Sequence, residues 1–259
     1  MTREPFDRNL RRLRRDRARR QGVDLFLLDR AFEDCQERVQ AIARPFDRAL
    51  LVGVPTPRWR AALEQLAGSV DVVDPGRLFA ADAGGSAGDE DRYDFGEARY
   101  DLVVAVGTLD TVNDLPVALQ LLRRSMSAGA CLIGAMAGGE LLPQLRAGLI
   151  AADRDGGRVV ARVHPRIDGP TLTALLAAAG FDQPVVDIDR VTLRYRALAD
   201  LVRDLRAMGA TNMMDSVRMP LTRTGWAKAS AAFESAAVEG RTAEAVDILH
   251  FLGWTKDQG

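Results

Sequence analysis

The residues that most metal and redox sites require are scarce in this sequence. Of its 259 residues, two are histidine and two are cysteine. The cysteines, Cys35 and Cys131, lie far apart, each within an apolar segment, and no CxxC or HxxxH spacing occurs. A zinc site, or any other metal site, is therefore not expected. The two thiols are expected to be reduced and buried, as in a cytoplasmic protein.

Long hydrophobic runs and a net charge are lacking as well. No apolar stretch approaches the roughly 20 residues that cross a bilayer. Residues 1–20 hold no apolar segment of the kind found in secretory signals. The formal net charge is -1, so the chain as a whole has no general attraction for nucleic acid. These absences predict a cytoplasmic protein without a nucleic-acid partner.

Positive charge is nevertheless concentrated at the N-terminus. The first twenty residues contain nine arginines and three acids, and Phe6, Leu10 and Leu13 recur at helical spacing. A basic amphipathic helix is predicted here. Two interpretations stay open: a solvated helix packed on the domain by a thin apolar stripe, or an electrostatic contact with an acidic partner or a membrane surface.

The rest of the chain alternates between strand and helix patterns. This predicts an α/β fold with a mostly parallel sheet, helices on both faces and an antiparallel edge from the last two strands. Residues 1–44 would form an N-terminal helical extension, and residues 45–259 the α/β domain, with a helical insertion at about 197–240. Strands are expected at 47–54, 70–74, 77–80, 100–107, 130–136, 184–195 and 245–254.

Helices are expected in the intervals between these strands. The second helix of the chain would start near Asp24 and end before Pro45. Residues 81–98 are small, acidic and glycine-rich, which predicts a loop. The later helices are expected at about 57–67, 115–125, 140–152, 170–179, 197–208 and 223–237.

Several longer segments resemble a known family. VNDLP, at the end of YDLVVAVGTLDTVNDLP, and RAMGATN, at the end of LVRDLRAMGATN, are the most specific. PFDRNLRRLRRDRARR, FDRALLVG, RVHPRID and DILHFLGW extend the resemblance from Pro5 to Trp254. The chain resembles the mitochondrial complex I assembly factor 5 family. That family has a class I S-adenosylmethionine (SAM) methyltransferase fold and is similar to the malonyl-carrier-protein O-methyltransferases.

The resemblance implies a Rossmann-like class I SAM methyltransferase fold with N-terminal helices, a site for SAM, and a role in assembling respiratory complex I. Arginine hydroxylation on a subunit of that complex is also attributed to the family. A SAM site needs glycines after the first strand, an acid at the end of the second, and polar groups after the third.

The loop that should bind SAM departs from the family pattern. The family's D-x-G-x-G-x-G falls on Leu51, Gly53, Pro55 and Pro57, so only the first glycine remains. Proline has no N–H to offer a ligand. Each hydrogen bond lost to a charged carboxylate costs about 1.5–3 kcal/mol. SAM binding is therefore expected to be weak or lost.

Other candidate cofactor-binding residues remain. Asp74 ends VDVVD, where the resemblance places the acid for the ribose hydroxyls, although Pro75-Gly76 make a plain turn the alternative. Asp89 and Glu90, with Asp91, lie where an adenine-contacting acid is expected, against the alternative of a solvated acidic loop. The candidate set is Gly53, Asp74, Asp89, Glu90, Gly107 and Thr108.

Candidate contacts to a substrate or partner follow the strand at 100–107. The family's His-Trp pair is replaced here by Asp110 and Thr111. Asn113 and Asp114 are further candidates, with a cap on the following helix as the alternative. His164 in RVHPRID is a candidate too, against a hydrogen-bonded loop histidine. No catalytic base is assigned.

The sequence thus predicts a methyltransferase-like assembly factor with an eroded SAM loop that acts on or chaperones a protein partner, such as a complex I subunit. The alternative is an active SAM-dependent methyltransferase acting on a carrier-protein ester or a protein side chain. A cytoplasmic location is expected, with peripheral contact to the inner membrane through the arginine-rich N-terminus.

Overall fold

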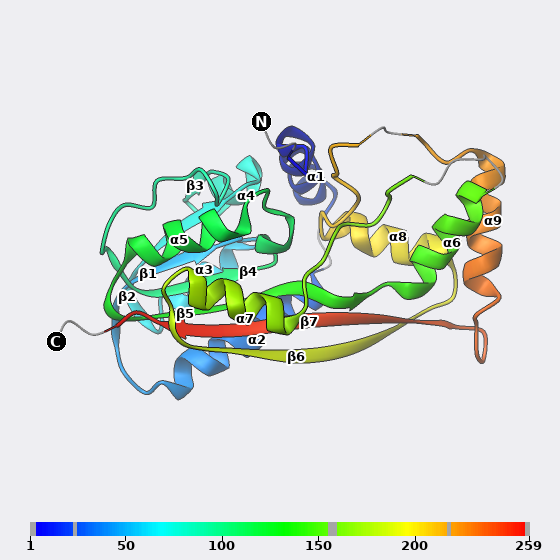
Figure 1. The fold of residues 1–259 in the computed structure, drawn as a ribbon. Coiled ribbons are helices and arrows are strands. Elements are labelled where there is room, and N and C mark those ends of the chain that lie inside the picture. The colour runs from blue at the N-terminus through cyan, green and yellow to red at the C-terminus, as the bar shows by residue number, and fades with distance from the viewer. Residues whose placement is uncertain (1–3, 23–24, 155–159, 217–218, 257–259) are drawn as a thin grey trace.

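The computed structural model describes residues 4–22, 25–154, 160–216 and 219–256, which form a seven-stranded sheet with helices on both faces (Figure 1). The strand order is β3-β2-β1-β4-β5-β7-β6. The parallel part consists of β1 (Phe46–Val52), β2 (Ala67–Asp74), β3 (Ser86–Ala87), β4 (Tyr100–Val106) and β5 (Met126–Leu141). β4 is an almost continuous apolar run, and β1 and β2 are buried mainly toward their carboxyl ends, where both faces of the sheet are covered.

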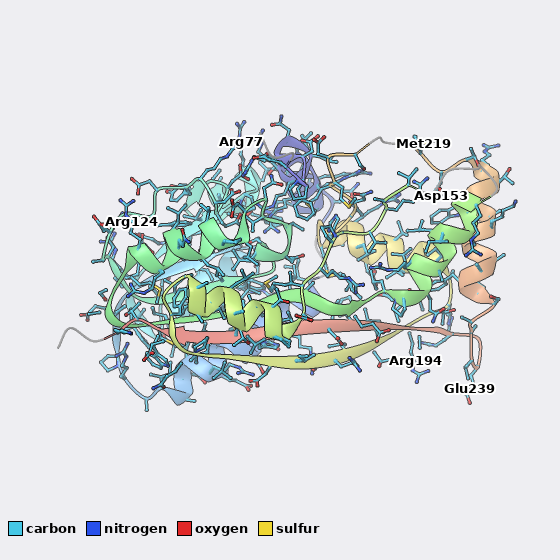
Figure 2. The ribbon with its side chains drawn as sticks, viewed as in Figure 1. Arg77, Arg124, Asp153, Arg194, Met219 and Glu239 are labelled. Atoms are coloured by element: carbon cyan, nitrogen blue, oxygen red, sulfur yellow. The ribbon has the colours of Figure 1, made fainter. Side chains whose placement is uncertain are left out.

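The two C-terminal strands form the predicted antiparallel edge. β7 (Thr242–Trp254) is antiparallel to both β5 and β6 (Asp182–Tyr195). β5, β6 and β7 are long strands that run past the other strands to the far end of the molecule (Figure 1). Arg194 and Glu239 point away from the molecule at that end (Figure 2). The predicted α/β class and mixed sheet are confirmed.

Helices divide the core into two layers. On one face, α2 (Phe26–Ala41) and α3 (Pro57–Leu63) pack against the apolar side chains of β1 and β4. On the other, α5 (Leu115–Ser125) packs against the opposite side chains of these strands, and α7 (Gly169–Ala178) packs beside it against β6. Three further helices lie beside the part of the long strands that runs past the rest of the sheet: α6 (Pro143–Arg154), α8 (Leu198–Ala207) and α9 (Arg223–Glu234).

The prediction of a short strand at 77–80 is wrong. Residues Arg77–Asp82 form the helix α4, in which Phe79 and Ala80 are buried. Parallel strands need a crossover connection, and α4 is the crossover between β2 and β3. The helix expected to start near Asp24 begins at Phe26, and Asp24 itself lies outside the described residues.

The face of the N-terminal helix α1 (Arg8–Gln21) that packs on the protein is not the apolar stripe that the sequence suggested. Asp7 is its N-cap, and Phe6 before it is buried. Leu13, however, is 58% exposed, whereas Arg11 and Arg15 are buried. The helix therefore faces the protein with its arginines. Across the described part of the chain, none of the helices has the length and hydrophobicity that a membrane crossing requires.

Candidate functional site

The carboxyl ends of the parallel strands bring together the residues assigned to a cofactor. Gly53, Asp74 and Gly107 follow or end β1, β2 and β4, which are neighbours in the sheet. Ligands bind at this edge in open α/β sheets. Gly53 has a φ of 79°, and a Cβ there would lie 2.3 Å from the carbonyl oxygen of Val106. The close approach of two chain segments therefore already requires this glycine.

The turn after Gly53 leads directly into the helix α3. Thr56 is the N-cap of α3, and its side chain accepts a hydrogen bond from the first turn; Pro57 occupies that turn. The N–H groups of Gly53 and Val54 both donate to β2, that of Val54 to Asp74 Oδ2 at 2.7 Å. These two N–H groups therefore donate within the protein, and Pro55 and Pro57 have no N–H that could bind a ligand.

Asp74 is fully buried, and both of its oxygens accept hydrogen bonds. Oδ1 accepts from the Gly76 N–H at 2.6 Å and from Arg15 Nε at 2.9 Å. Oδ2 accepts from Val54 and from Arg15 Nη2. The Arg15 guanidinium also lies 5.1 Å from the centre of the Phe79 ring. The acid that the resemblance assigns to the ribose is thus paired with an arginine of α1.

The acidic segment that follows is buried, so the alternative of a solvated loop is wrong for Glu90 and Asp91. Glu90 is 0% exposed and accepts hydrogen bonds from both terminal nitrogens of Arg11, at 2.7 and 3.0 Å. Arg11 also donates to the carbonyl oxygen of Thr108 at 2.6 Å. Arg8 binds Asp91 through two hydrogen bonds of 2.6 Å. Two more carboxylates therefore meet α1.

One face of α1 thus presents three guanidinium groups to the sheet edge. Arg8, Arg11 and Arg15 follow i, i+3 and i+7 spacing, which places them on the same side of a helix. Asp89 lies 3.4 Å from both Arg8 and Arg11 and is more exposed than Asp91. Burial would raise the pKa of Asp91, but the hydrogen bonds and charge of Arg8 hold that pKa below its usual value.

Gly107, Asp110 and Thr111 line a small cavity. Gly107 has a φ of 68°, and a Cβ there would lie 2.6 Å from Leu28 Cδ2. Thr108 Oγ1 is buried and has no hydrogen-bond partner among the residues that the structure describes. Asp110, in the short helix η1 (Leu109–Thr111), has its pKa raised by burial. The cavity measures about 140 Å³, below the roughly 300 Å³ at which ligand pockets begin.

The remaining candidates have structural partners. Asp114 is the N-cap of α5, which confirms the capping alternative for this residue. Asn113 fastens the segment before α1, exchanging hydrogen bonds of 2.8 and 3.0 Å with the backbone of Phe6. His164 Nε2 accepts a hydrogen bond from the Met213 N–H at 3.1 Å, and burial lowers the pKa of His164 to about 4. It is a hydrogen-bonded, neutral histidine.

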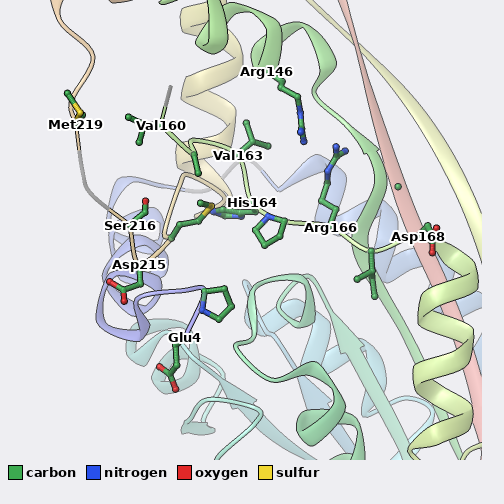
Figure 3. A pocket seen from close by; sticks show the side chains of 16 residues that line it. Glu4, Arg146, Val160, Val163, His164, Arg166, Asp168, Asp215, Ser216 and Met219 are labelled. Carbon is green, nitrogen blue, oxygen red and sulfur yellow. The ribbon is translucent and has the colours of Figure 1, made fainter. Parts of the chain in front are cut away.

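His164 also lines an open groove of about 910 Å³ (Figure 3). Arg146 of α6 and Arg166 point toward one another in this groove (Figure 3). The pKa of Arg166 is lowered by burial and then by the positive charge of Arg146. Neither guanidinium forms an ion pair with a carboxylate of the described chain. Glu4, Asp168 and Asp215 also line the groove, but no ion pair joins them to Arg146 or Arg166 among the described residues.

Sequence reasoning missed Arg8, Arg11 and Arg15 as site residues. It treated the N-terminal arginines as facing solvent or a partner, because a basic stripe on a helix is usually exposed. Two signals were present in the sequence. The three arginines share one helical face that carries few apolar residues, and residues 89–91 are all acidic. Neither observation by itself says that the two segments meet.

Comparison with known proteins places these observations in a family. No protein-family model matches the chain. A zebrafish (Danio rerio) protein, arginine-hydroxylase NDUFAF5, mitochondrial, is 30% identical over 271 residues, which cover 96% of this chain and 82% of the relative. A malonyl-[acyl-carrier protein] O-methyltransferase of Xylella fastidiosa (strain M23) is 29% identical over 160 residues, 61% of this chain and 52% of the relative.

Solved structures agree on the fold. A crystal structure of a putative methyltransferase from Bacillus halodurans C-125 superposes with a TM-score of 0.58 at 12% identity, covering 85% of this chain and 98% of that one. The fold is therefore that of the class I SAM-dependent methyltransferases. Within that class, the chain belongs to the NDUFAF5 family, the complex I assembly factor 5 family that its motifs indicated.

Proposed function

We propose that this protein is an assembly factor for respiratory complex I that acts by binding a protein partner, and that its affinity for SAM is weak or lost. The observation that carries the proposal is the pairing of Arg15 with Asp74. A nucleoside would have to displace a buried, bidentate guanidinium to reach this acid. Glu90 and Asp91 are engaged in the same way by Arg11 and Arg8.

The size of this obstacle follows from the cost of unpairing a buried ion pair. Leaving one buried partner without its counter-charge costs about 3–5 kcal/mol. Because 1.4 kcal/mol corresponds to a factor of ten, SAM affinity would fall by roughly 100-fold or more. The loss of amide donors at the proline loop adds to this effect. The residues present therefore do not fit SAM.

Titration of the purified protein with SAM and with S-adenosylhomocysteine tests the proposal. Isothermal calorimetry is expected to give no saturable binding at ligand concentrations up to about 1 mM. Micromolar binding of either compound would contradict it. That result would favour the alternative, an active methyltransferase acting on a carrier-protein ester or a protein side chain.

For the partner, the proposal points to the groove in Figure 3. Arg146 and Arg166 face each other there, so an acidic side chain of a complex I subunit would relieve their mutual repulsion. The printed name of the zebrafish relative is that of an arginine hydroxylase.

Charge reversal in the groove tests this contact. Arg146→Glu and Arg166→Glu are expected to reduce co-purification of complex I subunits with the tagged full-length protein at least about tenfold, since each replaces attraction by repulsion. Arg194→Glu is the matched control, because Arg194 is exposed on β6 at the far end of the molecule (Figure 2). Equal recovery with all three variants would exclude the groove as the contact.

The outer face of α1 is a second place where partners can bind. Arg17 and Arg20 are exposed, unlike the three arginines that face inward. Peripheral contact with an anionic membrane surface would use these outward charges. Binding to vesicles containing anionic lipid should then disappear near 0.5 M salt, since exposed charges are screened over roughly 3–10 Å at such ionic strengths.

A further inference from the structure

The carboxyl-terminal edge of the sheet is complementary in shape and charge to α1. Gly76 is the N-cap of α4, and a Cβ there would lie 2.9 Å from Arg15 Cβ and 3.0 Å from Asp74 Oδ1. Only a glycine leaves Arg15 room to reach the carboxylate. In the opposite direction, Asp16 of α1 accepts a hydrogen bond from the Leu78 N–H at 3.0 Å. The helix and the edge therefore fit each other through several independent contacts.

We propose that the acidic pocket of Asp74, Glu90 and Asp91 is a binding site for guanidinium groups, and that α1 is its permanent occupant, in the place that the fold otherwise gives to a nucleoside. The proposal rests on the proposed function only in requiring that SAM does not compete for the pocket. It assigns a ligand class to the site: arginine side chains, or other guanidinium compounds.

The hydrogen-bond geometry selects a guanidinium over a simple cation. Each of the three carboxylates receives two N–H donors from a single arginine. Such fork-like pairs match the planar guanidinium, whereas an ammonium is a compact point charge. Arg11 uses its remaining donors on the Thr108 carbonyl and, at 3.2 Å, on Thr111 Oγ1. The two hydroxyls of a ribose could also give two donors to one carboxylate, but they bring no positive charge to pair with it.

A second observation marks the pocket as a place for a polar group. Thr108 Oγ1 is a buried hydroxyl without a hydrogen-bond partner in the described parts of the chain, and its carbonyl oxygen already accepts from Arg11. This hydroxyl faces Gly53, where a Cβ would lie 3.1 Å from Oγ1, at the edge of the sheet where Val54 binds Asp74. The acids are therefore not the sole polar feature of the site.

Chemical rescue tests the proposal with the full-length protein. Arg15→Ala leaves Asp74 buried and unpaired, and is expected to lower the melting temperature by about 10 °C. Methylguanidinium at millimolar concentration should restore at least half of that loss. Methylammonium at the same concentration should not, because it cannot donate two parallel hydrogen bonds. Arg17→Ala is the matched control: this arginine is exposed on the same helix, so neither the loss nor the rescue is expected.

The outcomes separate the possibilities. Equal effects of the two cations, or no effect on a folded Arg15→Ala protein, would overturn the assignment. If Arg15→Ala does not fold, Arg8→Ala carries the same test, because the Arg8 side chain is 15% exposed and its loss is less severe. Tight binding of S-adenosylhomocysteine to the variant in place of methylguanidinium rescue would show a nucleoside site that α1 merely covers.

A double-mutant cycle adds a test that needs no ligand. Gly76→Ala should lower the melting temperature of the natural protein, because the new Cβ presses on Arg15. The same substitution should cost less in the Arg15→Ala background. Additive losses would contradict a pocket shaped around Arg15. The proposed function fails separately, if SAM binds the natural protein, whatever the rescue experiment shows.

Discussion

At the scale of single residues, Asp74 keeps a buried charge without any ligand. Four hydrogen bonds reach its two oxygens, two from backbone N–H groups and two from Arg15. A buried carboxylate is stable only when it is paired and hydrogen-bonded. Since all these donors come from the chain, the buried acid is stabilised by the fold itself and does not depend on a cofactor.

We expect the prolines of the loop to affect SAM binding less than Arg15 does. Pro55→Gly and Pro57→Gly together return two backbone N–H groups, yet Arg15 still covers Asp74. We expect no measurable binding of S-adenosylhomocysteine by calorimetry, and a loss of roughly 1–2 kcal/mol in the free energy of unfolding, because glycine frees the unfolded chain. A gain of micromolar affinity would show that the loop is the main obstacle.

His164 gives the protein a specific dependence on pH. Its pKa of about 4 in the folded state lies below the ordinary value of 6.5. The unfolded chain therefore binds the proton more readily, so this contribution to stability is complete above pH 6.5 and is lost as the pH falls toward 4.

Replacing His164 checks this sign. His164→Gln keeps an acceptor for the Met213 N–H but cannot titrate. Between pH 7.5 and pH 5, the free energy of unfolding in urea should fall by about 1–2 kcal/mol more for the natural protein than for the variant. His250 is present in both proteins, so its contribution cancels. Parallel pH profiles would rule out His164 as the cause.

At the scale of elements, α1 is held by charge more than by apolar contact. Its arginines form ion pairs with three buried carboxylates. The side chains of Asp74 and Glu90 are 0% exposed, and that of Asp91 is 2% exposed. Its apolar residue Leu13 remains largely in solvent. An element attached in this way cannot be removed without leaving several buried charges unpaired.

A truncation shows whether α1 is an appendage or part of the fold. Removing residues 2–20 should prevent stable folding, because unpairing a buried charge costs about 3–5 kcal/mol and a domain has only about 5–15 kcal/mol in total. The double variant Arg17→Ala, Arg20→Ala should melt within about 2 °C of the natural protein, since both side chains are exposed. A truncated protein that melts normally would exclude a structural role for α1.

The sequence patterns predicted elements better than contacts between them. The apolar run at 100–107 and the capping signal at Asp114 are local, so β4 and α5 could be placed before the structure was known. Phe79 and Ala80 lie in a segment too short for periodicity to separate a strand from a helix. The pairing of Arg15 with Asp74 joins positions 59 residues apart and leaves no local pattern. The division into a 1–44 extension and a 45–259 domain stays a prediction.

At the scale of the whole molecule, the long strands join two regions. The first contains the sheet edge with the acidic pocket and α1; the second contains α6 and α9, which pack together at the far end (Figure 1). Glu244 of β7 attaches α6 to the long strands. It is 0% exposed, and its carboxylate accepts hydrogen bonds from the first N–H groups of α6, at 2.6 Å from Leu145 and 3.1 Å from Gln144.

Cutting this link should loosen one region without the other. Glu244→Ala removes two charge-assisted hydrogen bonds, each contributing about 1.5–3 kcal/mol. We expect amide hydrogen exchange in α6 and α9 to become at least about tenfold faster, while exchange in β1 and β4 stays unchanged. Arg194→Ala, exposed on β6, is the control and should alter neither region. Faster exchange throughout the sheet would mean that the two regions unfold as one cooperative unit, and that the groove beside α6 cannot move independently of the pocket filled by α1.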